Sequence, residues 1–167
     1  LEGNKTKREV KLNSLNPAII SKGNHRHFMQ KEIYEQPETI SHTISEMYNG
    51  YGQISKKLSQ IIKDHPISIT LRAAGTSFFA GLSGKYGIES LSKIPVNVEI
   101  ASEFRYRKPF IDPKGLVITI SQSGESIDTL MAMRYAQKFG LKSVAIINSI
   151  GSTIDRESNY SLYTRAG

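Results

Sequence analysis

A stretch of hydroxyl side chains near the middle of the chain has the composition of a phosphate site. Residues 121–126 read SQSGES, so three serines, a glutamine and a glycine occur within six residues. This stretch follows the apolar run 116–120 and precedes a helical pattern that starts at Ile127. The first turn of a helix offers unpaired N–H groups and the positive end of the helix dipole, and Gly124 lets a ligand approach the backbone. The stretch therefore favours the binding of an anion such as a phosphate group.

A second loop of small residues stands in an equivalent position. Residues 73–77 read AAGTS, after the strand-like run ISITL at 67–71 and before a helical pattern at 78–91. Ligands of open parallel sheets bind beyond the carboxyl ends of the strands, so both loops are expected to face one crevice. Because the chain lacks GxxxxGK[ST], a sugar phosphate fits these hydroxyls better than a nucleoside triphosphate.

Helix capping is the alternative interpretation of both loops. Ser, Thr and Gly are common N-cap residues, and capping alone explains either loop taken by itself. Glu125 and Asp128 complement a helix dipole without any ligand, and they would repel an anion unless their carboxylates point away from it. Two loops at equivalent strand ends favour binding over capping alone.

The remaining polar residues give weaker indications of a functional site than the two loops do. The four histidines show no metal-ligand spacing and the chain has no cysteine, so we expect no metal site. Arg105, Arg107 and Lys108 form a basic cluster that could contact a phosphate or a partner, but a solvated loop explains it better.

The elements that must position these loops alternate along the chain. Helical patterns occur at 28–49, as two short helices or one helix bent at Pro37, and after Asn49-Gly50 as far as His65-Pro66. Strands are expected near 67–72, 96–100, 116–121, 143–148 and 160–164, with helices between them, including one over 127–139. The pattern predicts an α/β domain with a doubly wound, five-stranded parallel sheet of the flavodoxin-like type and a helical N-terminal segment.

Composition limits the remaining function classes. The 167 residues fit one domain, and no apolar run reaches the roughly eighteen residues of a membrane span, so no membrane partner is expected. Residues 1–31 carry +5 of the net charge of +7, so the basic excess does not indicate a nucleic-acid partner for the globular part. Residues 1–26 are interpreted as a linker or the tail of an upstream domain, and a cytoplasmic location is compatible with the lack of cysteine.

Five motifs give the chain a family resemblance. They are HFMQKEIYEQP (27–37), AGTS (74–77), IPVNVEIASEFRYR (94–107), SQSGESIDTL (121–130) and GSTIDRES (151–158). Because of these motifs, residues 27–167 resemble the first sugar isomerase (SIS) domain of the glutamine:fructose-6-phosphate amidotransferases. SQSGE alone would indicate only an SIS protein, whereas HFMQKEIYEQP and ASEFRYR are more specific.

The resemblance implies a set of substrate-binding residues. In that family the Thr-Ser pair of the first loop and the Ser-Gln-Ser run with the following Thr of the second loop hold the sugar phosphate. By position these residues are Thr76, Ser77, Ser121, Gln122, Ser123 and Ser126. Two departures occur, because Ala74 stands where the family usually has Cys and Ser126 where it has Thr. The second departure keeps the hydroxyl.

The resemblance also implies the reaction of a longer protein. Such an enzyme releases ammonia from glutamine in an upstream glutaminase domain and converts fructose 6-phosphate to glucosamine 6-phosphate, without a metal or organic cofactor. Its acid/base Glu, Lys and His are expected beyond residue 167, so this chain would be a C-terminally truncated domain that binds either sugar phosphate but catalyses nothing alone. The implied partners are the glutaminase domain, a second SIS domain and a second copy in a homodimer.

Three alternatives remain. SIS domains also occur in regulators, so a non-catalytic phosphosugar-sensing domain would show the same loops. A nucleic-acid binder would depend on the basic leader, and a purely structural assembly domain would depend on the resemblance to a dimeric family.

Overall fold

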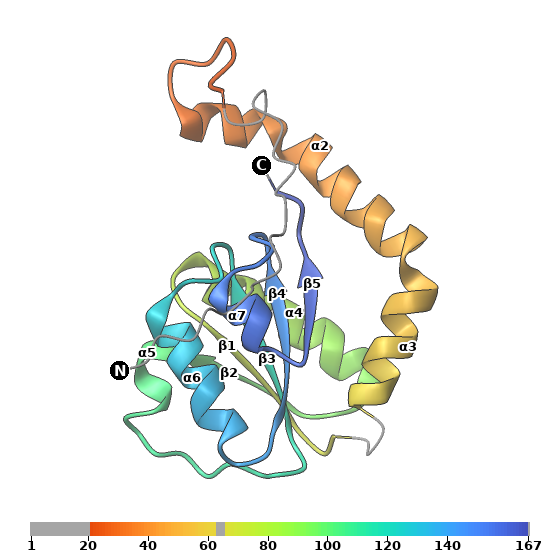
Figure 1. Cartoon of the computed structure of the whole chain (residues 1–167), viewed down its shortest axis with the longest axis vertical. Helices are drawn as coiled ribbons and strands as arrows, with labels where there is room; N and C mark the ends of the chain where they lie inside the picture. Colours follow the sequence, from red (N-terminus) through yellow and green to blue (C-terminus); the bar gives the residue numbers. More distant parts are fainter. Residues whose placement is uncertain (1–20, 63–65, 167) are drawn as a thin grey trace, which may run out of the picture.

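Five parallel strands form one sheet in the computed structural model, which describes residues 21–62 and 66–166. The strands are β1 (Ile69–Ala73), β2 (Val96–Ile100), β3 (Leu116–Ser121), β4 (Lys142–Ile147) and β5 (Tyr160–Tyr163). Their order across the sheet is β2-β1-β3-β4-β5, and every neighbouring pair is parallel (Figure 1). The predicted flavodoxin-like α/β fold is therefore confirmed.

Helices cover both faces of this sheet. The covering helices are α3 (Tyr51–Ile61), α4 (Thr76–Ser92), α5 (Ala101–Phe104), α6 (Ile127–Gln137) and α7 (Thr153–Glu157), and they are preceded by α2 (Phe28–Asn49). Figure 1 shows α5, α6 and α7 on one side of the sheet and α3 and α4 on the other. The short helices α5 and α7 were not predicted, because one turn of helix carries too few residues to show a period.

Burial on both faces explains the apolar composition of the central strands. On the α3/α4 face, Leu71 and Leu116 belong to a cluster against which Leu58 and Ile88 pack. On the other face, α6 and α7 contribute Leu130, Met133 and Ile154, which cluster with Ala145 and Ile147 of β4. A strand that is buried on both faces reads as a nearly continuous apolar run, as β3 and β4 do.

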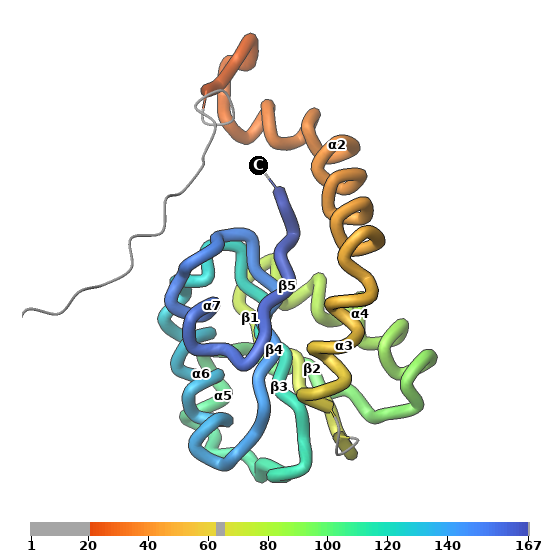
Figure 2. The backbone as a smooth tube through the Cα atoms, turned by 45° about the vertical axis from the view of Figure 1, so that its right-hand side comes forward, coloured from red at the N-terminus to blue at the C-terminus, as the bar shows by residue number. Residues whose placement is uncertain are grey.

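The N-terminal helices form an arm that leaves the sheet. α2 is one helix that continues through Pro37, and Figure 2 shows α2 and α3 as an arc whose concave side receives the segment after β5. An ion pair between Glu46 and Arg165 joins α2 to that segment. Most of the apolar side chains that mark α2 in the sequence are exposed, for example Ile40 at 57% and Ile44 at 62%. The helical period was therefore predicted, but in this chain it does not mark a core face.

Parts of two predictions lie outside the described residues. The linker assigned to 1–26 is described only from Ser21, where the chain makes turns and bends before α2. α3 ends at Ile61, and His65 of the expected helix stop is not described. Within residues 21–62 and 66–166, no helix combines the length and the apolar character that a membrane crossing requires.

Candidate functional site

The two small-residue loops lie at the ends of neighbouring central strands. β1 and β3 pair in parallel, and they lead into residues 74–75 and 122–126, which precede α4 and α6. From β1 the chain crosses to β2 on one side, and from β3 it crosses to β4 on the other. This reversal of winding marks the place where doubly wound sheets bind their ligands. The sequence-based expectation that both loops open at one end of the sheet agrees with this topology.

Helix α4 begins with two hydroxyls, those of Thr76 and Ser77, that have no partner among the described residues. Gly75 is the N-cap residue and has a φ of +57°, a conformation that favours glycine although nothing lies within 4 Å of an added Cβ. Thr76 is exposed, Ser77 is half-buried, and neither caps the helix through its side chain. Within the described part of the chain, neither hydroxyl makes a hydrogen bond. Both hydroxyls are thus available to a ligand.

The hydroxyls of residues 121–126 brace their own loop. Ser121 Oγ accepts a hydrogen bond from Gly124 N at 3.1 Å, and Ser123 Oγ accepts one from Glu125 N at 3.2 Å. Ser126 is the N-cap residue of α6 but makes no side-chain cap, and its Oγ accepts from Thr129 Oγ1 at 3.2 Å. The interpretation that these serines cap the helix by their side chains is therefore wrong. Among residues 21–62 and 66–166, no side chain caps the N–H groups of the first turn of α6.

The orientation of Glu125 meets a condition for anion binding. Its Oε1 accepts a hydrogen bond from Thr153 N at 2.8 Å, at the start of α7. That backbone N–H holds the pKa of Glu125 below its usual value. The carboxylate is thereby engaged with α7. For Asp128, which is half-buried in the first turn of α6, orientation away from an anion stays a prediction.

Sequence reasoning missed a third loop, residues 148–152, that supports the second one. Gln122 O accepts hydrogen bonds from Asn148 N at 3.1 Å and from Ser149 N at 3.3 Å, and Gly124 O accepts one from Ile154 N at 3.0 Å. Gly124 has a φ of +65°, and a Cβ added to it would lie 2.0 Å from Ser152 Oγ. The available signal was the run NSIGS (148–152) at the end of a predicted strand, which repeats the small-residue pattern of the other two loops.

Four of the predicted site residues belong to the second loop. Three of them reach the protein surface and one is buried. Gln122 and Ser123 are exposed, Ser126 is half-buried, and Ser121 is buried at the end of β3. Ser121 nevertheless keeps its hydroxyl hydrogen for a ligand, because its oxygen acts as the acceptor for Gly124 N. The arrangement can offer an anion hydroxyl donors from both loops together with the N-terminal end of α6.

The basic cluster follows β2 and α5, and two of its side chains contact neighbouring surface residues. Arg107 forms an ion pair with Glu99, and Arg105 donates to the Tyr106 hydroxyl at 2.6 Å. Both contacts are at the protein surface, which agrees with a solvated loop. Among the described residues, no three His, Cys, Asp or Glu side chains come together as a metal site requires.

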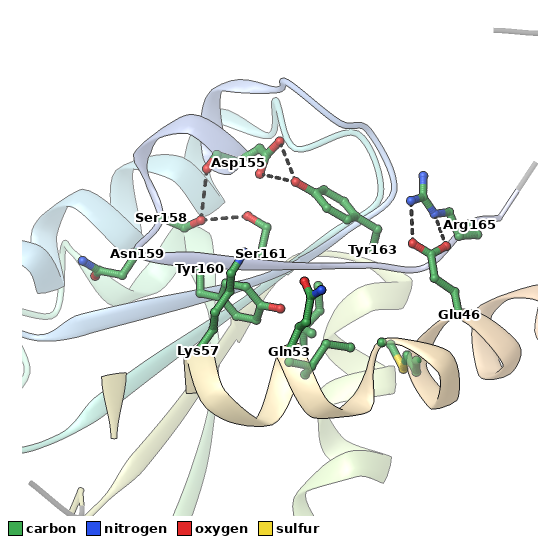
Figure 3. Close-up of a pocket in the computed structure, with 14 residues that line it drawn as sticks. Glu46, Gln53, Lys57, Asp155, Ser158, Asn159, Tyr160, Ser161, Tyr163 and Arg165 are labelled. Carbon is green, nitrogen blue, oxygen red and sulfur yellow. Dashed lines mark hydrogen bonds and ion pairs between the residues drawn. The ribbon is translucent and has the colours of Figure 1, made fainter. Parts of the chain in front are cut away.

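A cavity of about 420 Å³ occupies a different place, between the α2–α3 arm and β5 (Figure 3). Most of its charged groups are already engaged, since Glu46 contacts Arg165 and Asp155 accepts a hydrogen bond from the Tyr163 hydroxyl at 3.0 Å, while Lys57 Nζ lies 5.6 Å from the centroid of the Tyr160 ring. Burial and this hydrogen bond raise the pKa of Tyr163 to about 12. None of the six predicted site residues lines the cavity, so it is not the candidate phosphate site.

The comparisons with known proteins agree on the domain type. Residues 39–167 match the SIS domain family. The glutamine–fructose-6-phosphate aminotransferase (isomerizing) of Neisseria meningitidis serogroup A is 46% identical over 167 residues, which cover 96% of this chain and 27% of that protein. The protein of the same name from Clostridium tetani is 46% identical over 169 residues, which cover 99% of this chain and 28% of that protein. The chain thus spans little more than a quarter of the length of these relatives.

Solved structures extend the agreement to the fold. The C-terminal domain of glucosamine-fructose-6-phosphate aminotransferase from Francisella tularensis has a TM-score of 0.75 at 39% identity, covering 88% of this chain and 42% of that chain. Tagatose-6-phosphate ketose/aldose isomerase from Escherichia coli has a TM-score of 0.73 at 18% identity, covering 83% and 40%, and shows the fold alone. The resemblance inferred from the motifs is confirmed. The chain belongs to the SIS domain family.

Proposed function

We propose that this chain is the first SIS unit of a glutamine–fructose-6-phosphate aminotransferase and that it anchors the phosphate group of the sugar. The observation that carries the proposal is the placement of two hydroxyl-bearing loops at the carboxyl ends of β1 and β3, where the winding of the sheet reverses. The high identity to aminotransferases of that name supports the assignment to this enzyme.

Each predicted residue has a role in this proposal. Thr76 and Ser77 donate from the start of α4, while Ser121, Ser123 and Ser126 donate from the second loop. The uncapped N–H groups of α6 face the same anion and complement its charge. Gln122, exposed beside them, suits a sugar hydroxyl, because an amide both donates and accepts.

Serine and threonine donors make an exchangeable site rather than a permanent one. A hydrogen bond to a charged group contributes about 1.5–3 kcal/mol, and no lysine or arginine is required at the anion itself. The unit therefore fixes the sugar in position, and residues elsewhere in the parent enzyme transfer the protons. We propose a glutaminase domain, a second SIS domain and a second copy of the chain as partners. The exposed apolar side chains of α2 support such contacts.

A cytoplasmic location completes the proposal. It is supported by the phosphorylated ligand that the loops suit and by the lack of cysteine, which makes the fold independent of disulfide bonds.

An amide-resolved NMR titration tests the anchoring role. Glucosamine 6-phosphate is added to the chain, with glucosamine and inorganic phosphate as separate controls. We expect saturable shifts at Thr76, Ser77 and residues 121–126, strongest with the phosphosugar. Ser123→Ala should weaken binding about tenfold through the loss of one charged hydrogen bond. Ser83→Ala, which removes an exposed hydroxyl farther along α4, should leave the affinity unchanged. Shifts that are absent at millimolar phosphosugar, or that lie only around the cavity beside β5, would contradict the proposal.

A further inference from the structure

A buried arginine lies in the core behind the candidate phosphate loop. Arg72 belongs to β1 and is 1% exposed. Its Nη1 donates to the carbonyl of Ala132 in α6 at 2.9 Å, and its guanidinium carbon lies 3.4 Å from the centroid of the Phe104 ring. Its Nε has no hydrogen-bond partner within the described part of the chain. One hydrogen bond to a carbonyl and one contact with an aromatic ring offset only part of the free energy that is lost when a charged group is removed from water.

No carboxylate among residues 21–62 and 66–166 forms an ion pair with Arg72. Glu99 lies opposite it in the register of β2, but the Glu99 carboxylate pairs with Arg107. Burial lowers the pKa of Arg72 to about 9, so the guanidinium stays protonated at neutral pH. Its positive charge is therefore not neutralised by its surroundings.

The Arg72 side chain lies on the same face of the sheet as Ser121 of the candidate site. Arg72 pairs in register with Thr119 of β3, and Ser121 follows two residues later on the same face, about 7 Å along the strand. Ala132, which accepts from Arg72, lies five residues after Ile127 in α6, or roughly 8 Å along the helix axis. The guanidinium thus lies on the order of 10 Å behind the start of α6, with core side chains between them.

We propose that Arg72 is a positioning charge which strengthens the binding of dianionic sugar phosphates at residues 121–126 without touching them. The inference rests on the proposed phosphate site. A buried arginine without a partner carboxylate gives little stability, because a well-packed apolar residue at such a place is often neutral or stabilising. An apolar residue could not supply the positive electrostatic potential that Arg72 creates at the loops.

The size of the effect follows from Coulomb's law. At about 10 Å and an effective dielectric constant of about 40, one unit charge changes an equilibrium constant roughly fourfold. A dianion feels twice that free energy, which corresponds to a change of more than tenfold. Added salt screens the effect less than it screens exposed charges, because the guanidinium is buried.

The test compares two ligands that differ in charge. Dissociation constants for fructose 6-phosphate and fructose 6-sulfate are measured at pH 7.5 by calorimetry for the wild type, Arg72→Met, Arg72→Lys and Lys142→Gln. The phosphate is mainly a dianion at this pH and the sulfate is a monoanion. Lys142, exposed at the opposite end of β4, provides the matched loss of one charge.

We expect Arg72→Met to bind the phosphate more than tenfold and the sulfate about fourfold more weakly, while its unfolding midpoint stays equal or rises. Arg72→Lys should retain most of the affinity, and Lys142→Gln all of it. Equal losses for both ligands together with a lower unfolding midpoint would make Arg72 a structural residue and overturn the inference. If Arg72→Met does not fold, Arg72→Gln replaces it under the same criteria. If Arg72→Met binds both ligands as tightly as the wild type does, this inference alone is refuted. If the wild type binds neither ligand, the proposed function is refuted as well.

Discussion

Replacing Gly124 by alanine should damage both the fold and the candidate site, for two separable reasons. The first is conformational, since Gly124 has a φ of +65° and a residue with a Cβ loses about 1–2 kcal/mol in that region. The second is steric, because the new Cβ would lie 2.0 Å from Ser152 Oγ and 2.6 Å from Ser152 Cβ. Overpacking of this kind typically costs about 1–3 kcal/mol. We therefore expect Gly124→Ala to lower the free energy of unfolding by about 2–5 kcal/mol in total.

A double-mutant cycle separates the two terms. Ser152→Gly removes both atoms that the new Cβ would meet, so the combined variant Gly124→Ala/Ser152→Gly should regain the steric part. The expected coupling between the two positions is about 1–3 kcal/mol, the steric cost itself, which lies within the range of about 0.5–3 kcal/mol found for residues in direct contact. Gly140→Ala is the matched control, because Gly140 has a φ of +85° and nothing lies within 4 Å of its added Cβ. It should show the conformational term only, and Ser152→Gly should not rescue it.

Urea unfolding followed by circular dichroism gives the four free energies of the cycle, and amide NMR spectra report the loop directly. In Gly124→Ala the resonances of residues 121–126 and of Ser152 should shift, and binding of glucosamine 6-phosphate should weaken. A Gly124→Ala variant that is no less stable than Gly140→Ala and shows no coupling to Ser152→Gly would refute the argument. The contact between residues 121–126 and 148–152 would then be looser than the structure indicates.

Two further outcomes follow from the structure, and a third follows from the proposed function. Met133→Ala should lower the free energy of unfolding by about 2–5 kcal/mol, because the side chain is fully buried between α6 and β4, and urea titration measures the loss. Glu125→Gln should flatten the acid side of the stability profile, since a carboxylate with a lowered pKa contributes stability that is present above its ordinary pKa and lost as the pH falls through the folded value. The wild type should lose more stability than the variant between pH 5 and pH 3, and equal slopes would contradict the role given to Thr153. The 167-residue chain alone should form no glucosamine 6-phosphate from fructose 6-phosphate and ammonia, and steady formation in a coupled assay would disprove its anchoring-only role.

The strands, and the end of the sheet to which the two hydroxyl-bearing loops belong, were predictable because their physical causes are local. β3 was expected at 116–121 and is observed at Leu116–Ser121, since an apolar run ending in small polar residues can be recognised without tertiary contacts. The order of the strands follows from general rules for parallel sheets, and with it the meeting of the loops that follow β1 and β3.

Features that depend on long-range contact were not predictable. Ser126 occupies the N-cap position as expected, but its hydroxyl bonds to Thr129, and only the packed loop decides between the two partners. α7 is one short turn whose role comes from its contact with Glu125. Arg72 falls inside a predicted strand, yet its burial beneath Phe104 depends on a helix that the pattern does not show.

The attachment of the arm has a consequence for the order of folding. The hydrogen bond from Thr43 Oγ1 to the carbonyl of Thr164 spans 121 residues, and the contact between Glu46 and Arg165 spans 119. During synthesis the arm leaves the ribosome before the sheet, whereas its docking partners, Thr164 and Arg165, follow β5. Closing so long a loop has an entropic cost, and the strands that precede β5 can pair before it is met. A nascent chain should therefore carry an undocked helical arm with exposed apolar side chains until the sheet is complete. This interval is when the chain is most open to misassembly or to capture by a chaperone.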